Sequence, residues 1–346
     1  MSDFTSIPVI DLKDIHEPEG VEKVAEQVHK ACKEVGFFYI INHGIPEQLQ
    51  KDMEEKSIEF FKLPVEEKNK IAMEKAGMAW RGYFPVGGEY TMGRIDQKEG
   101  IYFGTELDST HPAVVAKTPM HGLNLFPENP SELGPIVLNY MNSLVNLGHL
   151  LMKAIAIGLK LPEDYFQIRF TDHPTILFRI FNYPEHIFKD EDDEWGVREH
   201  TDMGFLTILL QDNSGGLQVK NKSGKWIDAP PINNSFVVNI GDMLEIWTHG
   251  LYTATLHRVR NLANGPRLSF PFFFDPNWNA SLQPIERELI SFDEGTNVSN
   301  SEKRWDRLDL NSVYGKTYGE FVWAKIAKVF PNLARAERLT KINIEF

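Results

Sequence analysis

The sequence predicts a mainly β protein in which a jelly-roll core is wrapped by N-terminal and C-terminal helices. Two observations indicate this class. From Thr175 onward, short apolar segments alternate with turn residues at the spacing of an antiparallel sandwich or barrel. On both sides of this region, apolar residues recur at the three- and four-residue spacing of helices. No internal repeat or low-complexity linker divides the chain, so we expect one domain over residues 1–346.

Residues 1–130 are expected to form a mixed region of helices, short strands and loops. The segment IPVIDL is typical of a short strand, and GFFYIINHG is typical of a buried strand that ends at Gly44. The spacing of apolar residues predicts helices over Gly20–Glu34 and from about Pro46 to Phe61. Residues 77–130 are rich in glycine, proline and turn residues, which indicates long loops with short strands. Long ordered loops often carry binding residues.

The middle of the chain begins with a long helix, predicted from Pro135 to Leu159 by a single apolar stripe. Residues 175–280 then form the predicted jelly-roll core, with turns at QDNSGGLQV and NKSGKW. Its strands are expected in the segments TILFRIFNY, FLTILLQD, GLQV, WIDA, FVVNIG, LEIWT, HRVRN and RLSFPFFF. Beyond the core, helical spacing returns over Ser312–Leu333.

Composition limits the partners and the compartment. Of the 346 residues, 42% are hydrophobic, so the chain can bury a sizeable core. The formal net charge of −13 disfavours nucleic acid and anionic membrane surfaces as partners. The single cysteine, Cys32, cannot form an internal disulfide, and we find no signal peptide and no apolar run of roughly 20 residues. We therefore expect a cytoplasmic protein that works as a monomer.

A candidate metal site lies in the segment GVREHTDMGFLTILLQD. His200 and Asp202 are two residues apart, so on an extended chain they point to the same side. A lone His-x-Asp pair is often a turn or cap, but His257 on a later strand of the same region offers a third ligand. Two histidines and one carboxylate form the facial triad of non-haem Fe(II) oxygenases. The alternative for His257 is a core histidine whose hydrogen bonds are satisfied within the protein.

A candidate anion site follows in GPRLSFPFFF. Arg267 and Ser269 are again two residues apart, so both face the interior from one strand. A buried arginine is costly unless an anion meets it, and a guanidinium beside a hydroxyl matches a carboxylate. A small 2-oxo dicarboxylate could therefore bind the metal at one end and Arg267 at the other. The alternative, an exposed arginine on an edge strand, fits poorly with the apolar run Leu268–Phe274.

Together these motifs resemble the Fe(II)- and 2-oxoglutarate-dependent dioxygenases, in the branch similar to isopenicillin N synthase. The resemblance rests on His-Thr-Asp, a histidine about 55 residues later and Arg-x-Ser ten residues after that. It covers nearly the whole chain, since further similar segments follow in family order: IPVIDL, GFFYIINHGIP, RIFNYP, EHTDMG, GGLQV, VVNIGDMLEIWT, LHRV and RLSFPFFFDPN. The segment from EHTDMG through WIDAPP most resembles thymine 7-hydroxylase and its small-molecule relatives.

The resemblance implies a cupin-like double-stranded β-helix with iron at one mouth, and it implies roles for six residues. Fe(II) would be held by His200, Asp202 and His257. The distal carboxylate of 2-oxoglutarate would be bound by Arg267, Ser269 and the hydroxyl of Tyr183 in the Tyr-Pro motif. O₂ would be the second cosubstrate. No catalytic side chain is implied beyond the metal ligands.

Residues that border the substrate can be predicted from strand parity together with the resemblance. Arg179, Phe181 and Tyr183 alternate along one face, and Phe273 shares a face with Arg267 and Ser269. In the family, positions matching Arg179, Met203 and Phe273 border the substrate. Relatives such as thymine 7-hydroxylase have an aromatic residue where this chain has Met203, which argues against a flat nucleobase. Phe181 and Phe273 could equally be plain core aromatics.

The loop WRGYFPVGGEYTMG is the second source of substrate contacts. It resembles the substrate loop of relatives such as the ethylene-forming enzyme, and we single out Tyr83, Glu89 and Thr91, together with Arg81. Glu89 could face a cationic group of the substrate, such as an amine or a guanidinium. For each of these residues the alternative is a solvated turn.

The implied function is oxidative decarboxylation of 2-oxoglutarate to succinate and CO₂, coupled to hydroxylation or a related C–H oxidation of a small molecule. One alternative is an Fe(II) oxidase of the same fold that does not use 2-oxoglutarate, in which Arg267 and Ser269 would bind the substrate's own carboxylate. A second is a binding module that has lost catalysis. A zinc hydrolase is a more distant alternative, because it would have no use for the anion site.

Overall fold

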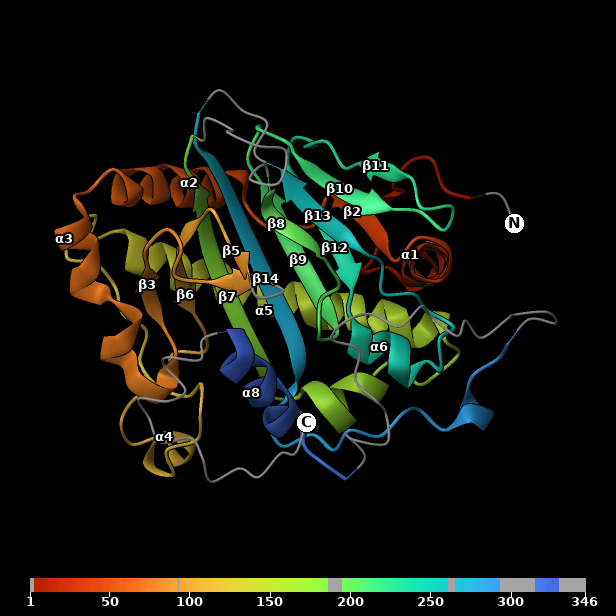
Figure 1. Cartoon of the computed structure of the whole chain (residues 1–346). Helices are drawn as coiled ribbons and strands as arrows, with labels where there is room; N and C mark the ends of the chain where they lie inside the picture. Colours follow the sequence, from red (N-terminus) through yellow and green to blue (C-terminus); the bar gives the residue numbers. More distant parts are fainter. Residues whose placement is uncertain (1–2, 92–93, 186–194, 261–264, 293–314, 330–346) are drawn as a thin grey trace.

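Two β-sheets form the centre of the protein (Figure 1). The structure is a computed structural model that describes residues 3–91, 94–185, 195–260, 265–292 and 315–329. The larger sheet contains, in spatial order, β1 (Val9–Asp11), β2 (Phe37–Ile41), β12 (Ser235–Ile240), β9 (Leu206–Gln211), β14 (Arg267–Asn277), β7 (Pro174–Tyr183), β6 (Glu99–Phe103) and β3 (Gly82–Phe84). The smaller sheet has the order β11 (Trp226–Asp228), β10 (Leu217–Lys220), β13 (His257–Arg260) and β8 (Trp195–His200).

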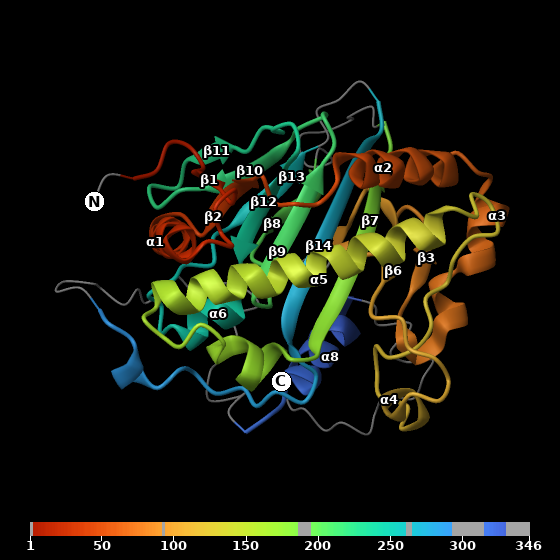
Figure 2. The same cartoon turned by 180° about the vertical axis from the view of Figure 1, so that it is seen from behind.

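The smaller sheet lies over one face of the larger sheet, and a long helix covers the opposite face (Figures 1 and 2). That helix is α5 (Leu133–Gly158), close to its predicted bounds. The paired sheets form a jelly roll with flanking helices, so the predicted fold class is confirmed. The expected strands at the N-terminus are confirmed as β1 and β2, which pair in parallel. Strand β2 in turn pairs antiparallel with β12 and so joins the core sheet.

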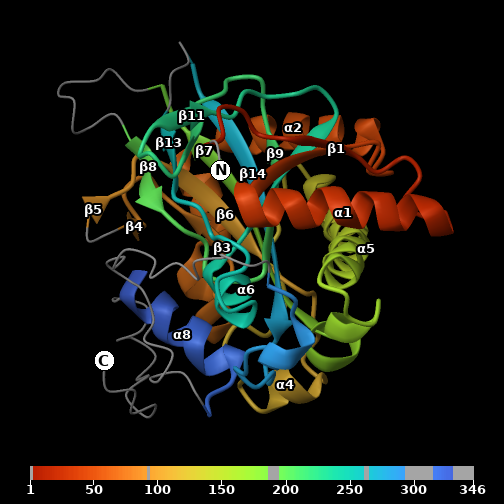
Figure 3. The same ribbon diagram turned by 90° about the vertical axis from the view of Figure 1, so that its right-hand side faces the viewer.

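The helices cover the edges of the sheets as well as one face (Figure 3). Two predicted N-terminal helices are confirmed as α1 (Pro18–Glu34) and α2 (Glu47–Phe61). Helix α8 (Tyr318–Val329) lies within the predicted C-terminal helix. Residues 315–317 precede it as a turn and a β-bridge, and residues 312–314 and 330–333 of the prediction lie outside the described residues. The shorter elements are α3 (Val65–Lys68), η1 (Asn69–Ile71), η2 (Met73–Ala79), β4 (Tyr90–Thr91), β5 (Arg94–Ile95), α4 (Pro112–Val115), η3 (Gln167–Thr171) and η5 (Arg287–Leu289).

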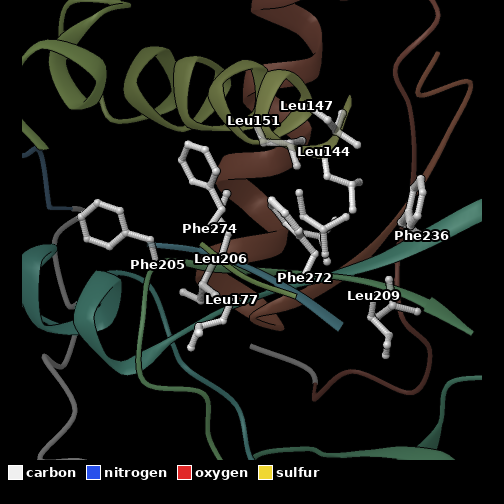
Figure 4. Close-up of a cluster of buried hydrophobic side chains, with 14 of the residues drawn as sticks. Leu144, Leu147, Leu151, Leu177, Phe205, Leu206, Leu209, Phe236, Phe272 and Phe274 are labelled. Atoms are coloured by element: carbon white, nitrogen blue, oxygen red, sulfur yellow. The ribbon is translucent and has the colours of Figure 1, made fainter. Parts of the chain in front are cut away.

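The hydrophobic core between α5 and the larger sheet fixes the strands that carry the site (Figure 4). Leucines 144, 147 and 151 of α5 point at the sheet, where they meet Phe272 and Phe274 of β14. Helix and strand approach so closely at Gly148 that a Cβ there would lie 2.4 Å from the ring of Phe274. Residues on the opposite face of β14 therefore point into the space between the sheets.

The predicted strand at LEIWT is wrong, because this segment lies in the short helix α6 (Asp242–Trp247). Gly241, just before this helix, lets the chain pass close to the backbone of Gly204, since a Cβ there would lie 2.4 Å from the carbonyl oxygen of Gly204. Asp242 then lies in the first turn, where a carboxylate stabilises a helix. An apolar run of this length does not by itself distinguish a buried helix from a strand.

No helix in the described part of the chain combines the length and the apolarity that a membrane crossing requires.

Candidate active site

Three side chains that can bind a metal meet between the two sheets. His200 ends β8 and is the strand partner of His257, which begins β13. Asp202 follows His200 after one residue, and its Oδ1 lies 3.7 Å from Nε2 of each histidine. One ligand atom from each residue can be chosen so that all lie within 4.8 Å of one another. The sequence prediction that these three residues come together is met by this geometry.

Both imidazoles are oriented by the backbone. Nδ1 of His200 lies 2.7 Å from the carbonyl oxygen of Arg198, and Nδ1 of His257 lies 3.2 Å from that of Thr255. Because a carbonyl oxygen only accepts, each Nδ1 carries a proton, and each Nε2 faces Asp202. Burial and the neighbouring His200 lower the pKa of His257 to about 4, although Asp202 opposes that shift. His257 is therefore neutral at pH 7, as a metal ligand must be.

The carboxylate of Asp202 is oriented by two side chains that sequence reasoning missed. Its Oδ2 accepts hydrogen bonds from the Thr207 hydroxyl and, at 2.7 Å, from the amide of Asn239. Burial opposes ionisation of Asp202, but the nearby histidines and these two hydrogen bonds outweigh it and lower the pKa of the carboxyl group. The sequence does contain a signal for Thr207 and Asn239. Each is a polar residue at a cavity-facing position within an apolar segment, FLTILLQD or FVVNIG.

The predicted anion site lies on the face of β14 that points into the space between the two sheets. Arg267 is fully buried, and its Nε donates to the carbonyl oxygen of Gly215 at 2.6 Å. Its Nη1 and Nη2 have no hydrogen-bond partner among the residues that the structure describes. Tyr183 is the strand partner of Arg267, and its ring lies 5.0 Å from the guanidinium carbon. Because buried donors are costly when unpaired, these two nitrogens fit an anionic group supplied by a ligand.

One cavity of about 210 Å³ is bordered by residues of both candidate sites, although Arg267 itself is not among its lining residues. It is lined by the three metal-binding candidates, by Tyr183 and Ser269, and by most of the predicted substrate residues: Arg179, Phe181, Met203, Phe273 and Glu89. It is also lined by residues that the sequence analysis did not single out, among them Trp80, Leu177, Lys98, Asp275 and Ile326. The side chain of Thr91 lies outside the described residues.

Two of the loop residues have structural partners instead. Tyr83 is not among the residues lining this cavity, and its hydroxyl donates to Glu99 at 2.6 Å. Arg81 is buried and donates to backbone carbonyl oxygens, including those of Thr105 and Met120. These contacts hold the segment against β6 and the chain that follows it.

Glu89 is buried at the cavity wall and is already paired. Its carboxylate forms an ion pair of 2.9 Å with Lys98 and accepts a hydrogen bond of 2.6 Å from the hydroxyl of Tyr102. A nitrogen of Arg179 lies 3.7 Å away. Burial opposes ionisation of Glu89, but these two cations and the hydroxyl lower the pKa of its carboxyl group below the ordinary value. No pattern in the sequence singles out Lys98 as the partner.

Asp275 joins the metal-binding turn to the C-terminal helix α8. Its carboxylate accepts hydrogen bonds from the backbone N–H of Phe205 at 2.9 Å and from the hydroxyl of Tyr318 at 2.7 Å. A Cβ on Gly204 would lie 1.6 Å from Oδ1 of Asp275, so only glycine permits this approach. Burial raises the pKa of Asp275 to about 7 despite these hydrogen bonds.

This raised pKa predicts a pH-dependent cost in stability. Because the pKa of Asp275 in the folded protein exceeds the ordinary 3.8, the folded state binds the proton more tightly, and stability falls as pH rises from about 4 to about 7. Asp275→Asn keeps an acceptor for Phe205 without a charge. For the metal-free proteins, we expect the difference in free energy of unfolding, variant minus wild type, to increase by a few kcal/mol from pH 5 to pH 8. Urea unfolding would measure it. Parallel pH curves for the two proteins would contradict this expectation.

Comparison with known proteins agrees with this geometry. Residues 7–129 match the model described as non-haem dioxygenase in morphine synthesis N-terminal, and residues 171–276 match the 2OG-Fe(II) oxygenase superfamily. A Dictyostelium discoideum protein named "Probable iron/ascorbate oxidoreductase" is 47% identical over 94% of this chain and 95% of its own length. A homoarginine-6-hydroxylase of Oryza sativa subsp. japonica is 38% identical over 82% of this chain and 90% of its own.

A solved structure supports the same assignment. The full-length Neurospora crassa protein crystallised with α-ketoglutarate and 5-formyluracil is 28% identical, with a TM-score of 0.74 over 93% of this chain and 96% of its own. The chain therefore belongs to the 2-oxoglutarate–Fe(II) oxygenase superfamily, and it is an iron- and 2-oxoglutarate-dependent dioxygenase.

Proposed function

We propose that His200, Asp202 and His257 hold Fe(II), and that Arg267, Ser269 and Tyr183 bind the distal carboxylate of 2-oxoglutarate. The donor set of two imidazoles and one carboxylate suits a non-haem ferrous ion. The observation that carries the cosubstrate assignment is the pair of buried Arg267 nitrogens without a partner among the described residues. A planar guanidinium with two free donors matches a carboxylate in a bidentate arrangement.

The protein's own part in the reaction is to position the reactants and to exclude water. Iron, when bound, supplies the redox chemistry that couples decarboxylation of 2-oxoglutarate to oxidation of a substrate C–H bond. Leu209, Leu217, Val197 and Val259 line the cavity that also contains Ser269 and Tyr183. Their apolar surfaces suit the methylene groups of 2-oxoglutarate. Beyond the metal ligands, no side-chain acid or base is assigned to the reaction.

We further propose that the substrate is an amino acid bordered by Arg179, Phe181, Met203, Phe273 and Glu89. These residues line the part of the cavity that includes both charged and aromatic walls. The relative from Oryza sativa is named for hydroxylation of homoarginine, which is an amino acid. A cavity with both charged and aromatic walls suits the charged groups and the hydrocarbon part of an amino acid better than a purely apolar cavity would.

The test is a screen for succinate release with purified enzyme, Fe(II) and 2-oxoglutarate. The panel contains L-homoarginine, L-arginine, L-lysine and the other common amino acids, with thymine as a neutral heterocycle. We expect at least one amino acid to stimulate succinate release and to gain oxygen in a one-to-one ratio, as mass spectrometry would measure. Product formation with ascorbate alone, without 2-oxoglutarate, would favour the alternative oxidase. An iron titration that showed no binding would favour the inactive binding module.

Thr207 offers an independent test of the iron site. Thr207→Val keeps the shape of the side chain but removes the hydroxyl that orients Asp202. We expect the affinity for Fe(II) to fall by about 10- to 100-fold, as measured by anaerobic titration, because partners that orient a ligand are worth that much. Thr207→Ser retains the hydroxyl and is the matched control, with affinity near that of the wild type. Equal losses in both variants would mean that packing, not the hydrogen bond, is responsible.

We also infer that the enzyme is a cytoplasmic monomer. The net charge of −13 favours mutual repulsion between copies, and the only cysteine, Cys32, is buried. Burial raises the pKa of the Cys32 thiol, which makes it unreactive. Light scattering during size-exclusion chromatography would test the oligomeric state.

A further inference from the structure

We propose that Arg179 is the receptor for the substrate's carboxylate, and that this contact selects carboxylic acids over the corresponding amines. The inference rests on the proposed function and names the residue that determines its specificity. It is carried by the arrangement of Arg179 on the cavity wall, where the guanidinium is held in place while part of its hydrogen-bonding capacity is unused.

Aromatic side chains hold the guanidinium of Arg179. Its carbon lies 4.4 Å from the centre of the Tyr102 ring and 4.9 Å from that of Phe273. The rings of Trp80 and Phe181 lie at 5.8 and 5.9 Å. Cation–π contacts of this kind stabilise the cation, but they use none of its N–H donors. The side chain is 15% exposed, which leaves it accessible from the cavity.

The donors of Arg179 are not consumed by its anionic neighbour. Its Nε is buried and has no hydrogen-bond partner within the described part of the chain. The distance of 3.7 Å between Nη1 and Glu89 is too long for a hydrogen bond. Glu89 is also engaged by Lys98 at 2.9 Å and by Tyr102 at 2.6 Å. Glu89 therefore orients Arg179 electrostatically and leaves the guanidinium able to bind a second carboxylate.

The position of Arg179 on β7 separates it from the proposed cosubstrate anchor. Arg267 is the strand partner of Tyr183, which is four residues further along β7 than Arg179. At 3.3 Å per residue this places the two arginines about 13 Å apart along the strand direction. Because residues 179, 181 and 183 share one face, Arg179 and Tyr183 both line the cavity, and Arg267 lies beside Tyr183 at the end of the strand away from Arg179. One ligand carboxylate is assigned to Arg267 and another to Arg179.

The test measures binding, without turnover, to enzyme loaded anaerobically with Fe(II) and 2-oxoglutarate. Each amino acid of the panel is paired with its decarboxylated amine, for example L-arginine with agmatine and L-lysine with cadaverine, and titrated by calorimetry. We expect the wild type to bind at least one amino acid about 30-fold or more tightly than its amine. The amine lacks the carboxylate, so the desolvated guanidinium of Arg179 would be left without its partner. In Arg179→Gln the acid should bind no better than the amine.

Two further variants separate recognition from structure. Arg179→Lys keeps the charge without the planar fork and should recover part of the preference for the acid. Arg169→Gln removes an exposed guanidinium that stacks on Tyr165 outside the cavity, and it should bind the acid as the wild type does. Thermal melting of Arg179→Gln within a few degrees of the wild type would show that the variant is folded.

The outcomes that overturn the proposal are distinct from those that overturn the iron and 2-oxoglutarate assignment. Unchanged affinity for the acid in Arg179→Gln, equal affinity of the wild type for acid and amine, or binding of thymine but of no amino acid would each refute the role of Arg179. A large loss of 2-oxoglutarate affinity in Arg179→Gln would assign this arginine to the cosubstrate instead. Failure of the wild type to bind Fe(II) or 2-oxoglutarate would overturn both proposals.

Discussion

Replacing Asp202 with alanine is expected to abolish iron-dependent turnover of 2-oxoglutarate without unfolding the protein. The carboxylate faces Nε2 of both histidines at 3.7 Å, so its removal leaves two imidazoles and no anionic protein ligand for the ferrous ion. Partners that merely orient a ligand are worth about 10- to 100-fold in affinity, so loss of a ligand itself should exceed 100-fold. Anaerobic Fe(II) titration and succinate release are the measurements.

The matched control for this change is Asp14→Ala, which removes an exposed carboxylate far from the site in sequence. It should leave both measurements unchanged. Circular dichroism would establish that Asp202→Ala keeps its secondary structure, as we expect because Thr207 and Asn239 can then bond to water. Undiminished succinate release by a folded Asp202→Ala protein would refute the ligand assignment.

Replacing Arg267 with methionine is expected to change binding and stability in opposite directions. The variant loses Nη1 and Nη2, which have no hydrogen-bond partner among the described residues, so the 2-oxoglutarate Kd should rise by about 30-fold or more. In the ligand-free protein the same change removes a fully buried cation and replaces it with an apolar side chain of similar length. Replacing buried charges in this way is often neutral or stabilising by about 1–4 kcal/mol. Calorimetry and denaturant unfolding would measure the two effects.

Variants at neighbouring positions make this prediction specific. Arg267→Lys keeps a charge but cannot offer two parallel donors, so we expect an intermediate Kd. Ser269→Ala removes a single hydroxyl and should raise the Kd by only about tenfold. If Arg267→Met bound 2-oxoglutarate as tightly as the wild type, Arg267 would not be the anchor.

Much of the site was predictable because it depends on strand parity. Residues two apart on a strand share a face, so His200 with Asp202 and Arg267 with Ser269 could be paired from the sequence. The long amphipathic helix α5 was predictable because its apolar stripe continues over many turns. The fold class followed from the recurring apolar segments after Thr175.

Features that depend on contacts between distant segments were not predictable in the same way. The pairing of Glu89 with Lys98 and Tyr102 needs the loop to fold back on β6, which no local pattern encodes. Asn239 reaches Asp202 only because β12 lies beside β9 in the larger sheet. Tyr83 was assigned to the substrate by its position in a loop, but its hydroxyl is turned toward Glu99.

The order of strands in the larger sheet has a consequence for attempts to divide the protein. Its two outer flanks, β1 with β2 and β3 with β6, all come from before residue 104, whereas the central strands come from residues 174–277. We infer that in a fragment starting after residue 130, β12 and β7 would become edge strands with unpaired backbone groups. Such exposed edges promote aggregation. Co-expression of the two halves should restore solubility, because β2 and β6 of the N-terminal half would supply the missing hydrogen bonds to β12 and β7.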